Sequence, residues 1–266
     1  MNIYLHELRT LRRSTVIWTC AIIALAALYF SFYPGVVHDA ADFKKLMDGY
    51  PAPIRAALGI SLGNVTSILG FYTMVFAFVP LCGAIQSMLF GMSILSRETR
   101  ERTADFLMVK PVSRAAIVSA KLFAALTMLL VTNVCYDAAS FFLASLVKTA
   151  DFSARTLFLI NLTLFFIQLI FLALGLFLSV LFKKLRSVLP VSLGVVFGLY
   201  MLGALVATGK NADTARFFSP FKYFDIAYIT RHTGYEVPYL ITGALVVLAA
   251  VMAAYIIYVK KDIHAV

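Results

Sequence analysis

Four polar side chains lie inside long apolar stretches of this 266-residue sequence, where they are placed to do chemistry. They are Gln86, Asn133, Asp137 and Gln168. Asp137 is the one acidic residue deep inside such a stretch, and Asn133 lies four residues earlier, on the same face of a helix. A carboxylate in the middle of a bilayer costs about 2.5–3.5 kcal/mol on insertion scales, so Asp137 should face protein or water. Two interpretations stay open: these groups line a polar path or hold a proton, or Asp137 lies nearer the interface and they only pack helices together.

A second informative set of residues forms the charged segment, residues 96–121. Its early charges are Arg97, Glu98, Arg100, Glu101, Arg102 and Asp105, which leave no room for a membrane span. Beside them Ala104, Phe106, Leu107 and Met108 predict a short amphipathic helix. That helix should end at Lys110-Pro111, because proline lacks an amide proton and disfavours a helical conformation in the residue before it. Ser113 can then cap the next helix, and the charged segment should contact something at the membrane surface.

No ATP-binding motif is present in the sequence. A Walker A loop binds phosphates with a glycine-rich cradle and a lysine. Its nearest match, residues 203–210, has the wrong glycine spacing and is followed by Asn211 where Ser or Thr is required. The zinc-protease pattern H-E-x-x-H is also missing, and no pair of acidic residues lies inside the apolar stretches. We therefore expect no ATP hydrolysis on this chain and assign no catalytic residue to it.

Composition places the chain in a membrane. Hydrophobic residues make up 62% of it and charged residues 14%, against about 25% charged residues in a soluble domain. Apolar runs of about 18 residues or more recur along it, which is typical of membrane helices. The net charge of +10 then indicates positive loops on one side of a membrane. It does not indicate nucleic-acid binding, because no basic patch alternates with stacking aromatic residues outside the spans. The three cysteines lack C-x-x-C spacing and a nearby histidine, so neither a metal nor a disulfide is expected.

The apolar runs predict an all-α integral membrane protein with one transmembrane domain over residues 1–266. Six spans are expected, at about residues 15–33, 68–94, 115–146, 156–182, 188–207 and 239–259. Residues 1–14 predict an interfacial amphipathic helix, with an apolar face and, opposite it, Glu7 and three arginines. A signal peptide is the other interpretation of this start, but the apolar run that follows is longer than an h-region.

Two further features concern the shape and the orientation of the spans. Pro80 should kink the second span, and Gly194 and Gly198 form a small-xxx-small pair typical of close helix packing. Lysine and arginine are denser at both termini, in the charged segment and in the turn at residues 183–186 than in the other loops. The positive-inside rule therefore predicts that both termini and the charged segment are cytoplasmic. We expect a multi-pass protein of a bacterial plasma membrane.

The charged segment resembles that of a known family, the ABC-2 type permeases, which are the membrane subunits of type-2 ABC exporters. The residues that match the family pattern are Glu98, Glu101, Thr103, Asp105, Leu107, Pro111, Val112, Ser113, Arg114 and Lys121. Arg102 departs from it, since a glycine usually precedes the threonine. Residues 219–225, S-P-F-K-Y-F-D, are similar to the family's aromatic outer segment, and residues 258–263, Y-V-K-K-D-I, to its common ending. The resemblance covers essentially the whole chain.

This resemblance implies a permease that dimerises with a second copy or a paralogue. Its cytoplasmic coupling helix, in the charged segment, would dock on a separate ABC ATPase subunit, which would hold ATP and magnesium. The implied ATPase-coupling residues are Glu98, Arg100, Glu101, Thr103, Asp105, Phe106, Leu107, Met108, Pro111 and Arg114. Charged members would complement the partner's charges, and the apolar ones would supply the buried contact.

Two other functions remain open on the sequence alone. An ATP-independent carrier or channel would show paired intramembrane charges or matched broken helices, and here Asp137 is the one candidate. A membrane scaffold that transports nothing would recruit a cytoplasmic partner through the same charged segment. The transported substrate and the choice between a homodimer and a heterodimer are not encoded in any pattern that we find.

Overall fold

The computed structural model describes residues 3–51, 54–55, 67–101, 113–182, 187–206 and 216–260. All regular structure in these ranges is helical, which confirms the all-α prediction. Five helices there are long and apolar enough to cross a membrane: α1 (Ile3–His38), α5 (Val79–Glu101), α7 (Arg114–Val147), α8 (Ala154–Leu181) and α12 (Val237–Lys260). Helix α9 (Leu189–Val206) is apolar but shorter, with 18 residues. The remaining elements are α2 (Ala40–Asp48), α4 (Ile68–Val75), η1 (Arg216–Phe218), η2 (Pro220–Lys222) and α11 (Ile226–His232).

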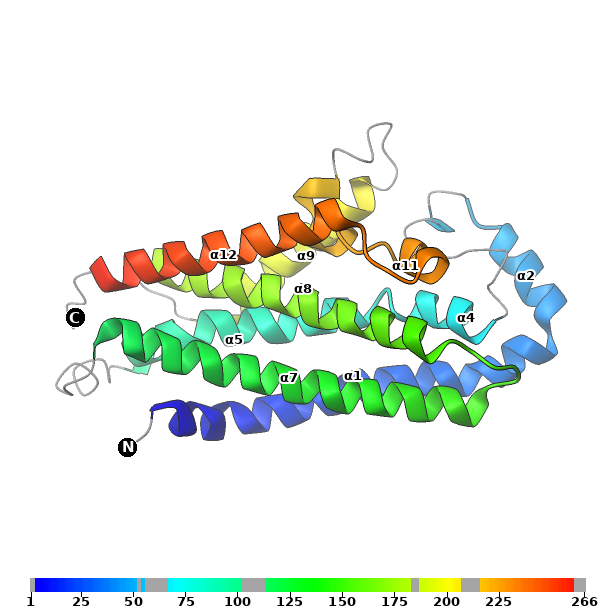
Figure 1. The fold of residues 1–266 in the computed structure, drawn as a ribbon, viewed down its shortest axis with the longest axis horizontal. Helices are drawn as coiled ribbons and strands as arrows, with labels where there is room; N and C mark the ends of the chain where they lie inside the picture. The colour runs from blue at the N-terminus through cyan, green and yellow to red at the C-terminus, as the bar shows by residue number, and fades with distance from the viewer. Residues whose placement is uncertain are drawn as a thin grey trace.

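The long helices lie side by side along the long axis of the molecule (Figure 1). Helix α1 begins and α12 ends at the same end of the bundle, which we call the near end. Helices α2, α4 and α11 lie at the opposite, far end. Helix α5 ends and α7 begins at the near end, on the same side as the start of α1 and the end of α12.

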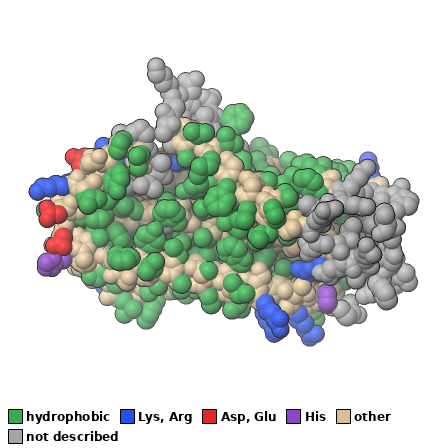
Figure 2. Space-filling model, turned by 180° about the vertical axis from the view of Figure 1, so that it is seen from behind, with side chains coloured by type: hydrophobic (Ala, Val, Ile, Leu, Met, Phe, Trp, Pro, Cys, Tyr) green, Lys and Arg blue, Asp and Glu red, His purple; other side chains and the backbone are tan. Residues whose placement is uncertain are grey.

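Helices α5 and α8 form the centre of the bundle. Both are largely buried, whereas much of α12 is exposed. Helix α8 is apolar on all sides, as expected for a helix surrounded by others. Large exposed apolar side chains cover the outside of the surrounding helices. In Figure 2 they cover the middle of the molecule, and the charged side chains gather towards its two ends, which is the distribution that a bilayer requires.

Two glycines allow α5 and α8 to cross in close contact. A Cβ atom on Gly175 would lie 2.7 Å from the carbonyl oxygen of Met88 and 3.1 Å from the Cα of Gly91. Close backbone approach at small residues is a common way for membrane helices to associate. The pair expected from the sequence, Gly194 and Gly198, makes no such contact: no described atom lies within 4 Å of a Cβ built on either one. The expected close helix packing at this pair is therefore not found among the residues that the structure describes.

The expected interfacial helix and the first span form one continuous helix. Helix α1 runs through residues 3–38 and continues past Pro34. Its buried face repeats every three or four residues and consists of Glu7, Leu11, Thr15, Thr19, Ile22, Ala26, Phe30 and Tyr33. The prediction that Glu7 shares the exposed face with the arginines is therefore wrong, because only 4% of its surface is exposed.

The second span is interrupted rather than kinked. Helix α4 ends at Val75 and α5 begins at Val79, one residue before Pro80. A proline ring clashes with the carbonyl four residues earlier, which here belongs to Phe76, the C-cap of α4. Pro80 itself lies in the first turn of α5. Amide protons there have no acceptor within the helix, so the missing amide proton of proline costs no hydrogen bond. The physical cause is the predicted one, and its effect is a break at residues 76–78 rather than a kink.

Serine caps define the starts of two long helices. The Oγ of Ser113 accepts a hydrogen bond from the amide of Ala116 (3.2 Å), which confirms the predicted cap of α7. Ser153 caps α8 in the same way through the amide of Thr156 (3.2 Å). Each cap satisfies one of the amide protons that a helix start leaves without an intrahelical partner.

Candidate functional site

The charged segment is only partly within the described residues. Helix α5 continues through Glu101, so Glu98, Arg100 and Glu101 belong to its last turns rather than to a separate helix, and their side chains are not described. Six other predicted coupling residues lie outside the described ranges: Thr103, Asp105, Phe106, Leu107, Met108 and Pro111. Arg114 is the first residue of α7, and its Nη1 donates a hydrogen bond to the carbonyl oxygen of Val259 (3.3 Å).

A buried ionic cluster ties together α5 and α7, the two helices in which the charged segment begins and ends. It consists of Glu7 on α1, Arg97 on α5 and Lys121 on α7, and we call it the near-end cluster. One carboxylate oxygen of Glu7 lies 3.4 Å from the Nζ of Lys121, and the other lies 3.6 Å from the Nη1 of Arg97. The Nζ of Lys121 also donates to the carbonyl oxygen of Ile94 (2.7 Å). Lys121 is 1% exposed, so its charge is held almost entirely away from water.

Sequence reasoning did not identify this cluster. It treated Glu7 as a solvated charge and Lys121 only as a match to a family pattern. One signal was available: Lys121 lies three residues after Val118 and four before Ala125, on an otherwise apolar helix face. A cation on an apolar face needs an anion nearby, and Glu7 is the single acidic residue of α1.

Further hydrogen bonds connect the same part of α7 to its neighbours. The hydroxyls of Tyr4 on α1 and Thr127 on α7 are 3.0 Å apart. The hydroxyls of Ser119 on α7 and Tyr255 on α12 are 2.8 Å apart. Together with the contacts of Arg114 and Lys121, these bonds fasten the first turns of α7 to α1, α5 and α12.

Three of the four polar residues predicted inside the spans form one hydrogen-bonded chain. Gln168 Nε2 donates to Gln86 Oε1 (3.0 Å), and Asn133 Nδ2 donates to Gln168 Oε1 (2.6 Å). Gln86 Nε2 in turn donates to Thr132 Oγ1 (3.0 Å), which also accepts from Thr19 Oγ1 (3.0 Å). We call these residues the amide chain; it joins α1, α5, α7 and α8 in the middle of the bundle.

Asp137 belongs to a second network, nearer the far end. It is half-buried, and its Oδ1 accepts a hydrogen bond from Asn161 Nδ2 on α8 (2.8 Å). The hydroxyl of Tyr72 on α4 donates to Asn161 Oδ1 and is hydrogen-bonded to the hydroxyl of Tyr136 (2.6 Å). Asp137 therefore faces other protein groups, as expected from the free-energy cost of exposing a carboxylate to lipid. These hydrogen bonds join α4, α7 and α8.

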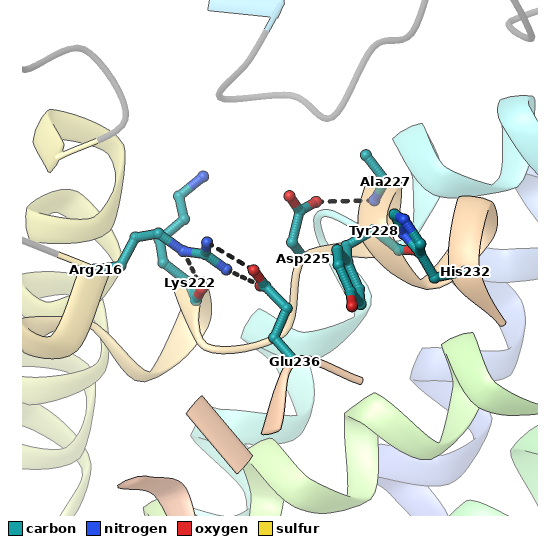
Figure 3. Close-up of polar contacts among 7 residues, drawn as sticks. All are labelled: Arg216, Lys222, Asp225, Ala227, Tyr228, His232 and Glu236. Atoms are coloured by element: carbon teal, nitrogen blue, oxygen red, sulfur yellow. Dashed lines mark hydrogen bonds and ion pairs between the residues drawn. The ribbon is translucent and has the colours of Figure 1, made fainter. Parts of the chain in front are cut away.

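The segment between α9 and α12 is anchored by an ion pair (Figure 3). Arg216 forms a two-pronged ion pair with Glu236, and its Nε donates to the carbonyl oxygen of Lys222 (3.2 Å). Its guanidinium also lies over the ring of Tyr239, 4.0 Å from the centroid. Burial lowers the pKa of Lys222, an effect that the charge of Asp225 opposes and that of Arg216 reinforces. This segment includes the aromatic motif at residues 219–225.

No group of three or more His, Cys, Asp or Glu side chains that would suit a metal ion occurs in the part of the chain that the structure describes.

Comparison with known protein families decides the identity of the chain. The family model described as ABC-2 family transporter protein matches residues 1–263. The chain belongs to this family. A search of curated proteins found no match. The long apolar helices and the family together make the chain a multi-pass membrane protein and a transmembrane subunit of an ABC transporter.

ABC-2 permeases are in general non-catalytic membrane subunits, and they generally work with ABC ATPases. For this permease, the structure brings the two helices that flank the charged segment to the near end and joins them there through Glu7. The intramembrane polar residues form two hydrogen-bonded networks rather than one.

Proposed function

We propose that this permease is the membrane subunit of an ATP-driven exporter and that its charged segment docks on a separate ATPase subunit. ATP and magnesium would be held by that ATPase. The permease would act as a dimer, with a second copy or a paralogue, and the dimer would enclose the path of the transported substrate. ATP-driven closure of the two ATPases would push on the two charged segments and switch the path between inward and outward access.

The position of the charged segment carries this proposal. It begins in the last turns of α5 and ends in the first turns of α7, and both of these lie at the near end, which the positive-inside rule assigns to the cytoplasm. The helices that flank it are fastened to α1 and α12 by the contacts of Lys121, Arg97 and Arg114. A push on the segment would therefore reach four membrane helices at once.

The amide chain and the Asp137 network are the groups that a path between the helices would use. They are polar groups in the middle of a largely apolar bundle, and Asp137 retains some exposure. An intramembrane carboxylate marks a candidate position for a substrate or proton contact.

Co-purification tests the docking role directly. The permease is expressed with each candidate ATPase subunit from the same source, solubilised in detergent and recovered through a tag on the permease. We expect one ATPase to be recovered with the wild type. Phe106→Ala or Leu107→Ala should weaken its binding about tenfold or more, because apolar anchors at the centre of an interface carry most of its affinity.

The matched control is Phe123→Ala, which removes an exposed phenylalanine from α7, beyond the charged segment. It should leave recovery of the ATPase unchanged. Equal affinity of wild type and Leu107→Ala would contradict docking through this segment. If no ATPase is recovered with any form of the permease, a carrier or a scaffold becomes the better explanation.

A further inference from the structure

The position of Glu7 is unusual for a charged residue near the start of a membrane protein. The arginines of the same part of α1, Arg9, Arg12 and Arg13, are exposed, as solvated or headgroup-facing charges should be. Glu7 instead begins the buried face of α1 and is followed on that face by Leu11. A buried carboxylate is tolerated only where cations and hydrogen bonds compensate the loss of water. A role in setting membrane topology would not require this burial.

The two carboxylate oxygens of Glu7 face two different helices. Oε1 lies 3.4 Å from Lys121 on α7, and Oε2 lies 3.6 Å from Arg97 on α5. Arg97 precedes the end of α5 by four residues, or about 6 Å of helix, and Lys121 follows the start of α7 by seven residues, or about 10 Å. Glu7 therefore bridges the two helices immediately before and after the loop that joins them.

Lys121 completes the connection between these helices. Its Nζ donates to the carbonyl oxygen of Ile94 on α5, one turn before Arg97. Tyr4, one turn before Glu7, is bonded to Thr127 on α7. Helices α1, α5 and α7 thus share one buried polar contact at the near end, and Glu7 supplies its negative charge.

We propose that Glu7 is a positioning residue for the coupling step: it holds α5 and α7 at a fixed spacing against α1, so that a displacement of the charged segment moves the three helices together. This inference rests on the proposed function, because it presumes that the charged segment receives a push from an ATPase. Without the bridge, the ATPase would still bind, but its movement would bend the ends of α5 and α7 without moving α1.

The test separates binding from coupling in the full permease–ATPase complex. Three variants are compared with the wild type: Glu7→Gln, Glu7→Asp and the double variant Glu7→Met/Lys121→Met. The double variant replaces Glu7 and its buried partner Lys121 by apolar side chains of similar size, an exchange that often preserves folding. Arg97, the third member of the cluster, stays in partial contact with water, because its side chain is 22% exposed. Three quantities are measured: the thermal unfolding midpoint, the recovery of the ATPase, and the permease-dependent rate of ATP hydrolysis in lipid nanodiscs.

We expect all variants to recover the ATPase like the wild type. Permease-dependent hydrolysis of ATP should fall at least about fivefold in Glu7→Gln and in the double variant. A fivefold change is about the lower limit of the energetic coupling typically found between two sites of a protein. Glu7→Asp, which keeps the charge on a shorter side chain, should restore part of the rate. A purely structural role would instead lower the unfolding midpoint and the recovery of the ATPase together, and that result would overturn the inference.

Glu236→Gln is the matched control, because it breaks a partly buried ion pair, that of Arg216, just before the start of α12 and away from the near end. It should leave the hydrolysis rate unchanged. Normal hydrolysis in a folded double variant would also overturn the inference, since the three helices would then be coupled by packing alone. The proposed function fails separately, if the wild type itself recovers no ATPase.

Discussion

Gln86 and Gln168 are fully buried, and each depends on the other for part of its hydrogen bonding. A buried amide that loses its partner keeps the cost of its lost hydration, whereas replacing both amides by apolar groups removes that cost. In membrane proteins such bonds are worth about as much as in soluble ones, because the unfolded chain in lipid also finds hydrogen-bond partners.

At the residue scale we therefore predict a positive coupling between these two glutamines. Gln86→Leu and Gln168→Leu alone should each destabilise the permease, and the double variant should be less destabilised than the sum of the two. The expected coupling energy is about 0.5–2 kcal/mol. Thermal unfolding of the four proteins in one detergent measures it, and strictly additive effects would show that the two amides do not bond to each other.

Helices α5 and α8 cross with almost no room for a side chain between them. Helices in lipid gain little from the hydrophobic effect, so their association depends on close packing of this kind. Gly91 and Gly175 face each other at the crossing, and a Cβ on either would meet backbone atoms rather than a movable side chain.

At the scale of elements, Gly175→Ala should force the two helices apart. The added Cβ would lie 2.7 Å from the Met88 carbonyl oxygen, and we expect a loss of about 1–3 kcal/mol, as for overpacked cores. Gly194→Ala is the control, since no described atom lies within 4 Å of its Cβ position. There alanine should be neutral or slightly stabilising, because it favours helix more than glycine does. Equal unfolding midpoints for the two variants would argue against the close crossing.

The bundle as a whole has two chemically different ends. The near end holds the start of α1 with its exposed arginines, the end of α12 and the near-end cluster, while the far end holds α2, α4 and α11. Helix α2 is amphipathic and carries the exposed ion pair of Asp42 and Lys45. The positive-inside rule predicts a cytoplasmic near end, and α2 would then lie outside the cell.

At the scale of the whole molecule, labelling of single cysteines tests this orientation. In a background with Cys20, Cys82 and Cys135 changed to alanine, Asp42→Cys should react in intact cells with a membrane-impermeant maleimide. Arg12→Cys should react only after the membrane is permeabilised. The reverse pattern would invert the topology and place the charged segment outside, which would exclude docking on a cytoplasmic ATPase.

The sequence alone determined the features that depend on local chemistry. The all-α class, the positions of the long apolar helices, the Ser113 cap and a disturbance of the second span by Pro80 follow from hydrophobic length and backbone hydrogen bonding, which act within a few residues. The family was also accessible from sequence, because its motifs are short and ordered along the chain. The predicted coupling residues Phe106, Leu107 and Met108 remain predictions, since they lie outside the described residues.

Only the tertiary structure decided which distant residues are partners. Helical periodicity assigned Glu7 to a polar face. In the structure its carboxylate is buried, because the positive charges of Lys121 and Arg97, which lie far along the chain, compensate its loss of hydration. Likewise, the spacing of Gly194 and Gly198 predicted a site of close helix packing. The close crossing is instead between α5 and α8, at Gly91 and Gly175. Periodicity shows which face of a helix differs from the others; the choice of neighbour depends on how all the helices pack, which no single stretch of sequence contains.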